Sequence, residues 1–293
     1  MGSHFLLINE LEVKTMKPEE EISQEEQTKR TYYDLVGQWN LPIIHAGGLK
    51  ATEELLDMCQ VTETTALLDV GCGTGYTACQ IAKKYGCRVV GIDISEKMIA
   101  RATERAKKEN LEIEFQIANV TQLPFEDQSF DVVVMESFLN ILGKADIISK
   151  ALNEISRVTR PGGRVGANEV FADESTPPEL LEHIRELLKN TMGPGQGLAQ
   201  FTPTEFKTFF EGAGLKVTHM TKKPSMSGAG DIIKIMGLFG FIRYSIRAIY
   251  DMIVIPELRE GARKAAPAKR IMERKKDTKK FFGYALIVAQ KPQ

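Results

Sequence analysis

Three glycines and two aspartates of this chain have the spacing of a site for a charged nucleoside. Gly71, Gly73 and Gly75 follow a short apolar run. Glycines at a strand-to-helix turn let the backbone approach a ligand closely and point free N–H groups at it. Asp69 precedes Gly71 by two residues and Asp93 follows it by 22 (93 − 71), near the offset of about 20 at which a carboxylate meets ribose hydroxyls in nucleotide folds. Both acids therefore fit one nucleoside.

The glycine loop does not match two common phosphate-binding motifs. A dinucleotide fingerprint would need a third glycine at the position of Tyr76, and a P-loop would need a following Gly-Lys-Ser/Thr, which is absent. S-adenosylmethionine carries an ammonium, a sulfonium and a carboxylate, and this charge pattern suits carboxylate side chains beside backbone N–H donors. We therefore expect S-adenosylmethionine as the cofactor.

The elements that must position this loop follow from the pattern around it, in which short β-branched apolar runs alternate with helical stretches. Such alternation is typical of βαβ units and a parallel sheet, whose ligands bind beyond the carboxyl ends of the strands. Strands are expected over residues 66–70, 87–92, 113–117, 130–135, 164–169, 215–221 and 282–289. Helices are expected over residues 76–85, 96–108, 145–158, 178–190 and 203–213, with Ser95 as an N-cap and a turn at 160–163.

The composition is that of a globular protein, with 43% hydrophobic and 26% charged residues among 293. The 38 basic and 39 acidic residues nearly cancel, which removes the general electrostatic argument for a nucleic-acid partner. No secretory signal is visible, and the four cysteines match neither zinc nor disulfide spacings, so we expect a cytoplasmic protein without a metal. The acid-rich start predicts a flexible lead-in over residues 1–25, followed by a single domain over 26–293.

Four motifs then occur in the order found in class I S-adenosylmethionine-dependent methyltransferases, which this chain resembles over about residues 60–170. They are Leu68 to Gly75, Val90 to Ser95, Leu123-Pro124-Phe125 with Phe130 to Val133, and Arg160 to Gly163. Within the family the set most resembles the small-molecule branch that includes the ubiquinone/menaquinone C-methyltransferases. The resemblance implies an α/β, Rossmann-like, seven-stranded and mostly parallel sheet flanked by helices, with an antiparallel last strand. It also implies a core of about 60–225 and 281–290, an N-terminal helical cap of about 28–58, and a helical lid insertion of about 228–280 before the last strand.

The resemblance also assigns roles to matching residues. The glycine loop, including Cys72, would hold the methionine part of the cofactor, while Asp69 would orient its ammonium directly or through water. Asp93 would bind the ribose, and Glu136 would lie near the methionine and the transferred methyl. The residues expected around the adenine are Ile94, Met98, Asn119 and Val120, of which Asn119 departs from the aspartate that the family often has there.

Methyl transfer to an acceptor is an in-line displacement, so the protein mainly aligns the acceptor and excludes water. A general base is needed only if the acceptor must lose a proton. We expect His45, Tyr33 and Glu136 as catalytic residues, with a structural role as the alternative for His45. The residues expected to contact the acceptor are Asn140, Asn168 and Glu169 at the ends of two strands, and Phe239 in the insertion.

The insertion contains an apolar run over residues 232–253 with too many charges for a comfortable transmembrane span. Arg243, Arg247 and Asp251 recur every four residues, which places them on one helical face and leaves a broad apolar face. That face either packs on the sheet or a second copy, or covers a lipophilic acceptor and contacts a membrane surface. The basic run after Pro256 is either a solvated helix face or a site for anionic lipid or another anion.

Together these features predict transfer of the methyl group of S-adenosylmethionine to carbon or oxygen of a small lipophilic acceptor, such as a quinone-like ring or an isoprenoid-tailed substrate, with S-adenosylhomocysteine as product. One alternative is N-methylation of a small amine or phospho-base, because a neutral amine needs little base catalysis. Another is a non-catalytic, cofactor-binding regulatory module. A monomer and a homodimer are both compatible with the sequence.

Overall fold

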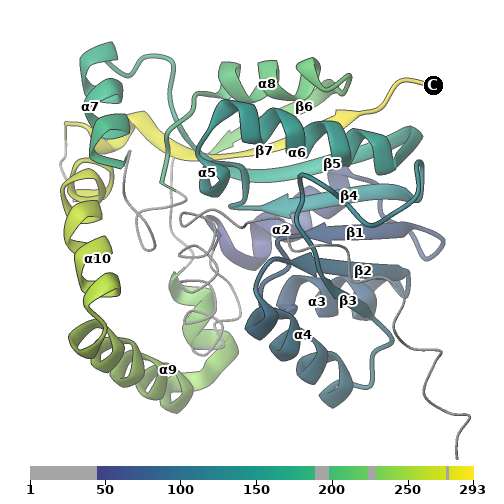
Figure 1. The fold of residues 1–293 in the computed structure, drawn as a ribbon, viewed down its shortest axis with the longest axis horizontal. Coiled ribbons are helices and arrows are strands. Elements are labelled where there is room, and N and C mark those ends of the chain that lie inside the picture. Colours follow the sequence, from purple (N-terminus) through teal and green to yellow (C-terminus); the bar gives the residue numbers. More distant parts are fainter. Residues whose placement is uncertain (1–44, 189–197, 224–228, 275–276) are drawn as a thin grey trace, which may run out of the picture.

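The protein is described by a computed structural model that covers residues 45–188, 198–223, 229–274 and 277–293. Seven strands form one sheet in the order β3-β2-β1-β4-β5-β7-β6, in which only β7 runs antiparallel to its neighbours. The predicted fold class is thus confirmed (Figure 1). The strands are β1 (Ala66–Val70), β2 (Arg88–Asp93), β3 (Glu114–Ile117), β4 (Phe130–Glu136), β5 (Thr159–Ala172), β6 (Lys216–Lys223) and β7 (Phe282–Gln290).

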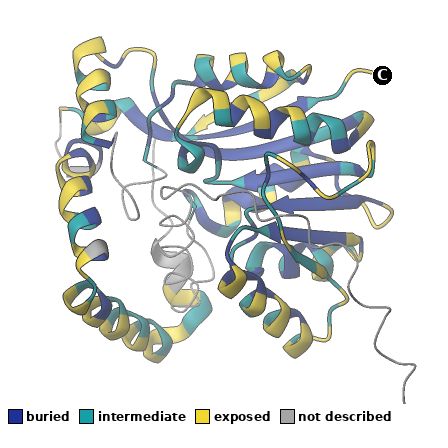
Figure 2. Ribbon diagram, viewed as in Figure 1, coloured by how far each residue is buried: buried dark blue, intermediate teal, exposed yellow. Residues whose placement is uncertain are grey.

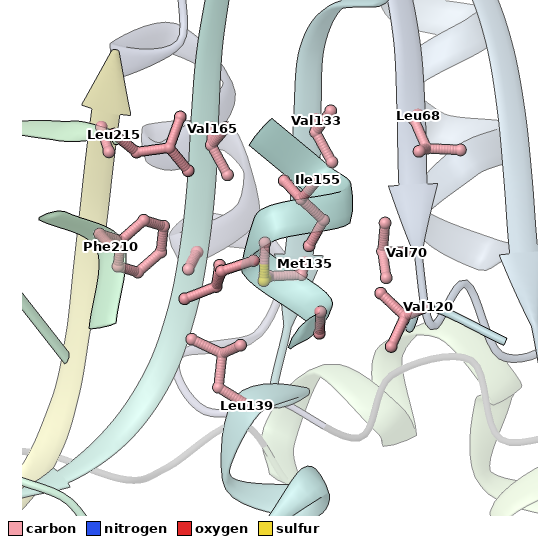
Figure 3. Packing of buried hydrophobic residues seen from close by; sticks show 14 of the residues in the cluster. Leu68, Val70, Val120, Val133, Met135, Leu139, Ile155, Val165, Phe210 and Leu215 are labelled. Carbon is pink, nitrogen blue, oxygen red and sulfur yellow. The ribbon is translucent and has the colours of Figure 1, made fainter. Parts of the chain in front are cut away.

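Helices cover both faces of this sheet. One face packs against α2 (Gly48–Met58) and α3 (Tyr76–Tyr85), with α4 (Glu96–Lys108) beside β2 and β3. The opposite face packs against α6 (Ala145–Val158) and α8 (Pro203–Gly212). The strands in the middle of the sheet are apolar on both sides because helices exclude water from both. Figure 3 shows the second of these layers, with Leu68, Val133 and Val165 from three adjacent strands and Ile155 from α6.

Several helices begin or end at residues whose types favour helix caps. The hydroxyl of Ser95 accepts the backbone N–H of Met98 at 3.1 Å, as predicted for an N-cap of α4. At α8, Thr202 and Glu205 form a reciprocal capping box with Pro203 in the first turn. Gly86 ends α3 in the left-handed conformation, with φ of 64°.

The expected start of the fifth strand was wrong. A turn was predicted at residues 160–163 and a strand over 164–169, whereas β5 extends from Thr159 to Ala172. Pairing explains the difference, because β7 continues opposite β5 as far as Ala172, and Lys291 exchanges backbone hydrogen bonds with Gly162 and Gly163. The pairing of β5 with β4 shifts register between Thr159 and Arg164, and Gly162 and Gly163 lie in this irregular part.

The helical insertion before the last strand forms an arm of two helices, α9 (Ala229–Val254) and α10 (Pro256–Lys269), followed by the short turns η1 (Arg270–Arg274) and η2 (Lys279–Phe281). The arm curves past the edge of the sheet where the parallel strands end (Figure 1). It is held at its far end by an apolar cluster in which Ala268 and Ile271 pack with Ile184 of α7 (Pro178–Leu188). Among the described residues, no helix has the length and hydropathy needed to cross a membrane.

Candidate active site

The loop after β1 bends through three glycines with positive φ: 70° at Gly71, 53° at Gly73 and 73° at Gly75. Such angles are readily adopted only by glycine. A Cβ at Gly71 would lie 2.5 Å from the ring of Phe138, whereas a Cβ at Gly73 would meet nothing within 4 Å. Gly73 is therefore the point of the loop where a ligand can approach the backbone.

Asp93 at the end of β2 is joined to this loop. Its Oδ2 accepts the backbone N–H of Gly73 at 3.0 Å, and its Oδ1 accepts the N–H of Ser95 at 2.9 Å. The end of β3 lies alongside, because the N–H of Ala118 donates to the backbone oxygen of Asp93. This contact brings the segment with Asn119 and Val120 next to the acid, as the predicted adenine edge requires. Met98 and Val120 are buried, and Ile94 and Asn119 are half-buried.

Asp69 is buried, with 3% of its surface exposed, and its Oδ2 atom has no hydrogen-bond partner among the described residues. Burial, and then the nearby charges of Glu136 and Asp93, raise the pKa of Asp69 to about 8. The charges of Glu136 and Asp93 thus repel further negative charge at the glycine loop, including that of an ionised Asp69. A pyrophosphate would add to this repulsion, whereas a ligand with an ammonium and a sulfonium would relieve it. The residues therefore fit S-adenosylmethionine better than a dinucleotide.

His45 and Glu136 form a buried pair beside these acids. Nε2 of His45 lies 3.4 Å from Oε2 of Glu136, and both side chains are 7% exposed. The hydroxyl of Thr52 on α2 lies 3.0 and 3.1 Å from the two carboxylate oxygens and 3.4 Å from Nε2 of His45. The structure thus brings together two of the three predicted catalytic residues.

Asn168 of β5 adds an amide to this pair. Its Nδ2 donates to the backbone oxygen of Ala46 at 2.9 Å and to Oε1 of Glu136 at 3.3 Å, and it lies 3.3 Å from Nδ1 of His45. Asn168 is fully buried. It therefore lies at the predicted catalytic pair, within β5 rather than at its end.

Asn140 and Glu169 are buried, and their polar atoms form hydrogen bonds with each other and with the backbone. Glu169 accepts the backbone N–H groups of Phe138 and Leu139 at 2.6 Å each, at the start of α5 (Leu139–Leu142). Asn140 donates to Glu169 and to Val170, and its Oδ1 accepts the N–H of Gln200. Burial raises the pKa of Glu169 to about 7. Both side chains are fully buried, so this arrangement favours a structural role over the predicted contact with an acceptor.

The other predicted acceptor residue, Phe239, is 87% exposed on α9. Tyr33, the third predicted catalytic residue, lies outside the described residues. The cysteines are buried thiols, and burial raises the pKa of Cys72 well above its usual range, so its side chain is neutral. No group of His, Cys, Asp or Glu side chains within the described ranges could hold a metal ion.

Sequence reasoning missed two threonines of the site. Thr52 lies inside the predicted cap, in α2, whereas His45 lies in the bend before that helix, so no sequence spacing indicated that both reach Glu136. Thr77 lies one residue into α3 after the glycine loop, and its hydroxyl donates to Oε2 of Glu136 at 3.3 Å. Its position directly after the loop was a usable signal.

Comparison with known proteins shows that the chain is similar to methyltransferases. A family model described as a methyltransferase domain matches residues 67–163. The O-methyltransferase rstn1 of Aspergillus nomiae is 31% identical over 201 residues, which cover 66% of this chain and 84% of that protein. The 27-O-demethylrifamycin SV methyltransferase of Amycolatopsis mediterranei is 33% identical over 173 residues, covering 57% and 60%.

A solved structure agrees in fold. The crystal structure of the [4+2]-cyclase SpnF superposes with a TM-score of 0.66 and covers 92% of this chain and 96% of its own. At 21% identity this likeness shows the fold alone, because one fold supports many reactions.

Proposed function

Because the chain belongs to the class I S-adenosylmethionine-dependent methyltransferases, we propose that it methylates a hydroxyl oxygen, or else a carbon, of a small lipophilic acceptor. The observation that carries this proposal is the buried pair of His45 and Glu136 beside the glycine loop. Transfer to a hydroxyl needs a base, whereas transfer to a neutral amine does not. One of the relatives described above is an O-methyltransferase by name, and the name of the other gives an O-demethylated compound as its substrate.

The cofactor would be held by the glycine loop, Asp69 and Asp93, and it supplies a methyl group that is already activated on a sulfonium. The chain's own residues then bind the acceptor, exclude water and accept a proton. In this proposal Nδ1 of His45 takes the hydroxyl proton of the acceptor. Glu136 faces Nε2, so its carboxylate stabilises the imidazolium that forms.

Asn168 is compatible with this role for His45. An amide nitrogen has two hydrogens, and the shortest of its three contacts, 2.9 Å to Ala46, uses one of them. The second is shared between Glu136 and Nδ1 of His45, both at 3.3 Å. In the tautomer that has its proton on Nε2, facing Glu136, Nδ1 has a lone pair. This lone pair can accept a proton when an acceptor displaces the weak contacts of Nδ1 with Asn168 and with the backbone oxygen of Ala46, at 3.3 and 3.4 Å.

A lipophilic acceptor is supported by the arm at the carboxyl end of the sheet, whose α9 helix carries exposed Phe239, Ile242 and Ile246. The quinone-like or isoprenoid-tailed ring expected from the sequence is one member of this class. The enzyme relatives favour catalysis over the non-catalytic alternative, and peripheral contact with a membrane is a further part of the proposal.

The test is incubation of the purified protein with methyl-labelled S-adenosylmethionine and a panel of phenols, quinols and alkyl amines, followed by mass spectrometry of the products. We expect a methyl ether, and a loss of about 10²–10⁴-fold in turnover for His45→Ala. His219→Ala, which changes an exposed histidine of β6, is the matched control and should retain full turnover. Methylated amines with unchanged His45→Ala turnover would instead establish the N-methyltransferase alternative.

A further inference from the structure

The helix α9 presents an apolar face to solvent. After a kink at Gly237, where φ is 69° and ψ is 168°, large apolar side chains lie exposed at helical spacing, with Phe239 at 87% and Ile246 at 64%. Figure 2 shows that the arm is mainly exposed along α9. The residues of this face, here termed the α9 stripe, are Phe239, Ile242, Ile246, Ile249, Tyr250 and Ile253.

The geometry of the stripe is continuous. At 3.6 residues per turn and 1.5 Å per residue, these six side chains occupy an arc of about 100° and a length of about 21 Å. The opposite side of the helix faces the protein, since Asp251 is 2% exposed and accepts a hydrogen bond from Arg247 at 2.8 Å. A surface helix normally turns its apolar side to the core. The reversed orientation of α9 indicates a surface that is covered in function.

The charges beside the stripe define what can cover it. Arg243 and Arg247 are exposed along one edge, and the single acidic residue of α9 after the kink at Gly237, Asp251, is buried. In α10 further basic side chains are exposed: Arg259, Arg263, Lys264 and Lys269. An apolar face bordered by arginines is the pattern of a helix that lies in the interface of an anionic bilayer.

We propose that α9 docks the protein on an anionic lipid surface, with the α9 stripe among the upper acyl chains and Arg243 and Arg247 among the headgroups. The arm is connected to the site, because α9 contacts α2, the helix that carries Thr52. The proposal deepens the proposed function in one respect, which rests on it: a lipophilic acceptor would reach the site from the bilayer.

A second copy of the chain is a poorer occupant of the stripe. After the kink at Gly237 the only acid of α9 is the buried Asp251, so the exposed side of this part offers no acidic side chain to the arginines of a partner helix. In an antiparallel two-fold pair the two arginine edges would meet on the same side, where like charges repel. Phospholipid headgroups supply the missing negative charge.

Vesicle sedimentation of the full chain tests the proposal. We expect binding to vesicles of equal parts phosphatidylcholine and phosphatidylglycerol, much weaker binding to phosphatidylcholine alone, and partial release by high salt. Ile246→Asp combined with Ile249→Asp should weaken binding by at least about 10-fold. Ile117→Asp changes a 54% exposed isoleucine of β3 and should not. Arg243→Glu should weaken binding more than Lys207→Glu on α8.

Absence of binding to the anionic vesicles, or equal binding by the double variant, would overturn the proposal. A dimer that light scattering detects and the double variant dissociates, without vesicle binding, would assign the stripe to a second copy. Vesicle binding requires neither cofactor nor acceptor, so its failure is distinct from failure of the proposed function, which the turnover of His45→Ala reports.

Discussion

The backbone N–H of Gly73 donates to Oδ2 of Asp93 at 3.0 Å, which ties the loop after β1 to the end of β2. One carboxylate thus holds the glycine loop in place at the strand end where the ribose is expected to bind. Its two oxygens accept the N–H groups of Gly73 and Ser95, and a carboxylate can accept about four hydrogen bonds. A loop residue and a strand end that are 20 residues apart in sequence are thus joined directly.

Replacement of Asp93 by alanine should therefore weaken cofactor binding twice over, through lost contacts to the ribose and a loosened loop. Hydrogen bonds to charged groups contribute about 1.5–3 kcal/mol each, which predicts a 10- to 100-fold or greater increase in Kd. Calorimetric titration with S-adenosylmethionine and S-adenosylhomocysteine measures this. Asp127→Ala, at an exposed acid paired with Arg157, should bind normally. Unchanged affinity in Asp93→Ala would exclude the assigned role.

Gly73→Ala and Gly86→Ala form a matched pair of variants, whose comparison separates the effect of a methyl group on ligand binding from its effect on backbone strain. Both glycines have positive φ, 53° and 64°, and neither Cβ would meet a protein atom within 4 Å. Each substitution should cost about 1–2 kcal/mol of stability from backbone strain alone. Only the methyl at Gly73 should also raise the Kd for S-adenosylmethionine, because it occupies space for the ligand. Equal affinities in calorimetry would place the ligand elsewhere.

Much of this site could be predicted because parallel strands end at one edge of a sheet. Once the strands are recognised by their apolar runs, Asp69, Asp93 and Glu136 are expected at the same edge. In the structure the charges of Glu136 and Asp93 raise the pKa of Asp69. The same logic explains why the order of local motifs predicted the fold. Such inferences need only the spacing of side chains along the chain.

Contacts between distant segments could not be predicted in this way. Whether Glu169 faces an acceptor or caps α5 depends on how the backbone of Phe138 and Leu139 turns after β4, which no periodicity encodes. The exposure of Phe239 likewise depends on the kink at Gly237. The length of β5 depends on its pairing with β7, a strand more than 100 residues further on.

Cofactor binding should become tighter as pH rises towards 8, because of Asp69. Its pKa of about 8, raised by burial, means that it carries a proton at neutral pH, and a cationic ligand favours the ionised form. Binding must then release this proton, so affinity should rise by up to about tenfold per unit between about pH 6 and 7.5. Asp69→Asn should abolish this slope in calorimetry, while Asp93→Ala should retain it. A flat profile in the wild-type protein would contradict the assignment.

Ionisation of Asp69 has the opposite effect on folding: the free energy of unfolding decreases as pH rises. A folded pKa raised above its usual 3.8 favours folding at low pH, and this contribution declines as pH rises through 8. In ligand-free protein, Asp69→Asn should therefore raise Tm more at pH 8 than at pH 5. Thermal unfolding at both values provides the measurement.

Glu169→Ala should destabilise the protein strongly. The carboxylate accepts the N–H groups of Phe138 and Leu139 and the amide of Asn140, and its loss leaves buried donors without a partner. The expected cost is about 2–4 kcal/mol, visible as a lower midpoint in urea unfolding. Glu182→Ala on the exposed side of α7 should change stability by less than about 0.5 kcal/mol. A small effect of Glu169→Ala would return Glu169 to the candidates for acceptor contact.

Thr52 should act as a positioning residue for the catalytic pair. Its buried hydroxyl lies within 3.1 Å of both oxygens of Glu136 and 3.4 Å from Nε2 of His45, so it fixes the carboxylate relative to the imidazole. Thr52→Val keeps the shape and removes the hydroxyl; we expect kcat to fall about 10-fold, the equivalent of one hydrogen bond of about 1.4 kcal/mol, with an unchanged KM for S-adenosylmethionine. Thr52→Ser retains the hydroxyl and should restore kcat. If the valine and serine variants lose activity equally, packing of the methyl group rather than the hydroxyl accounts for the loss, and the proposed positioning of Glu136 fails.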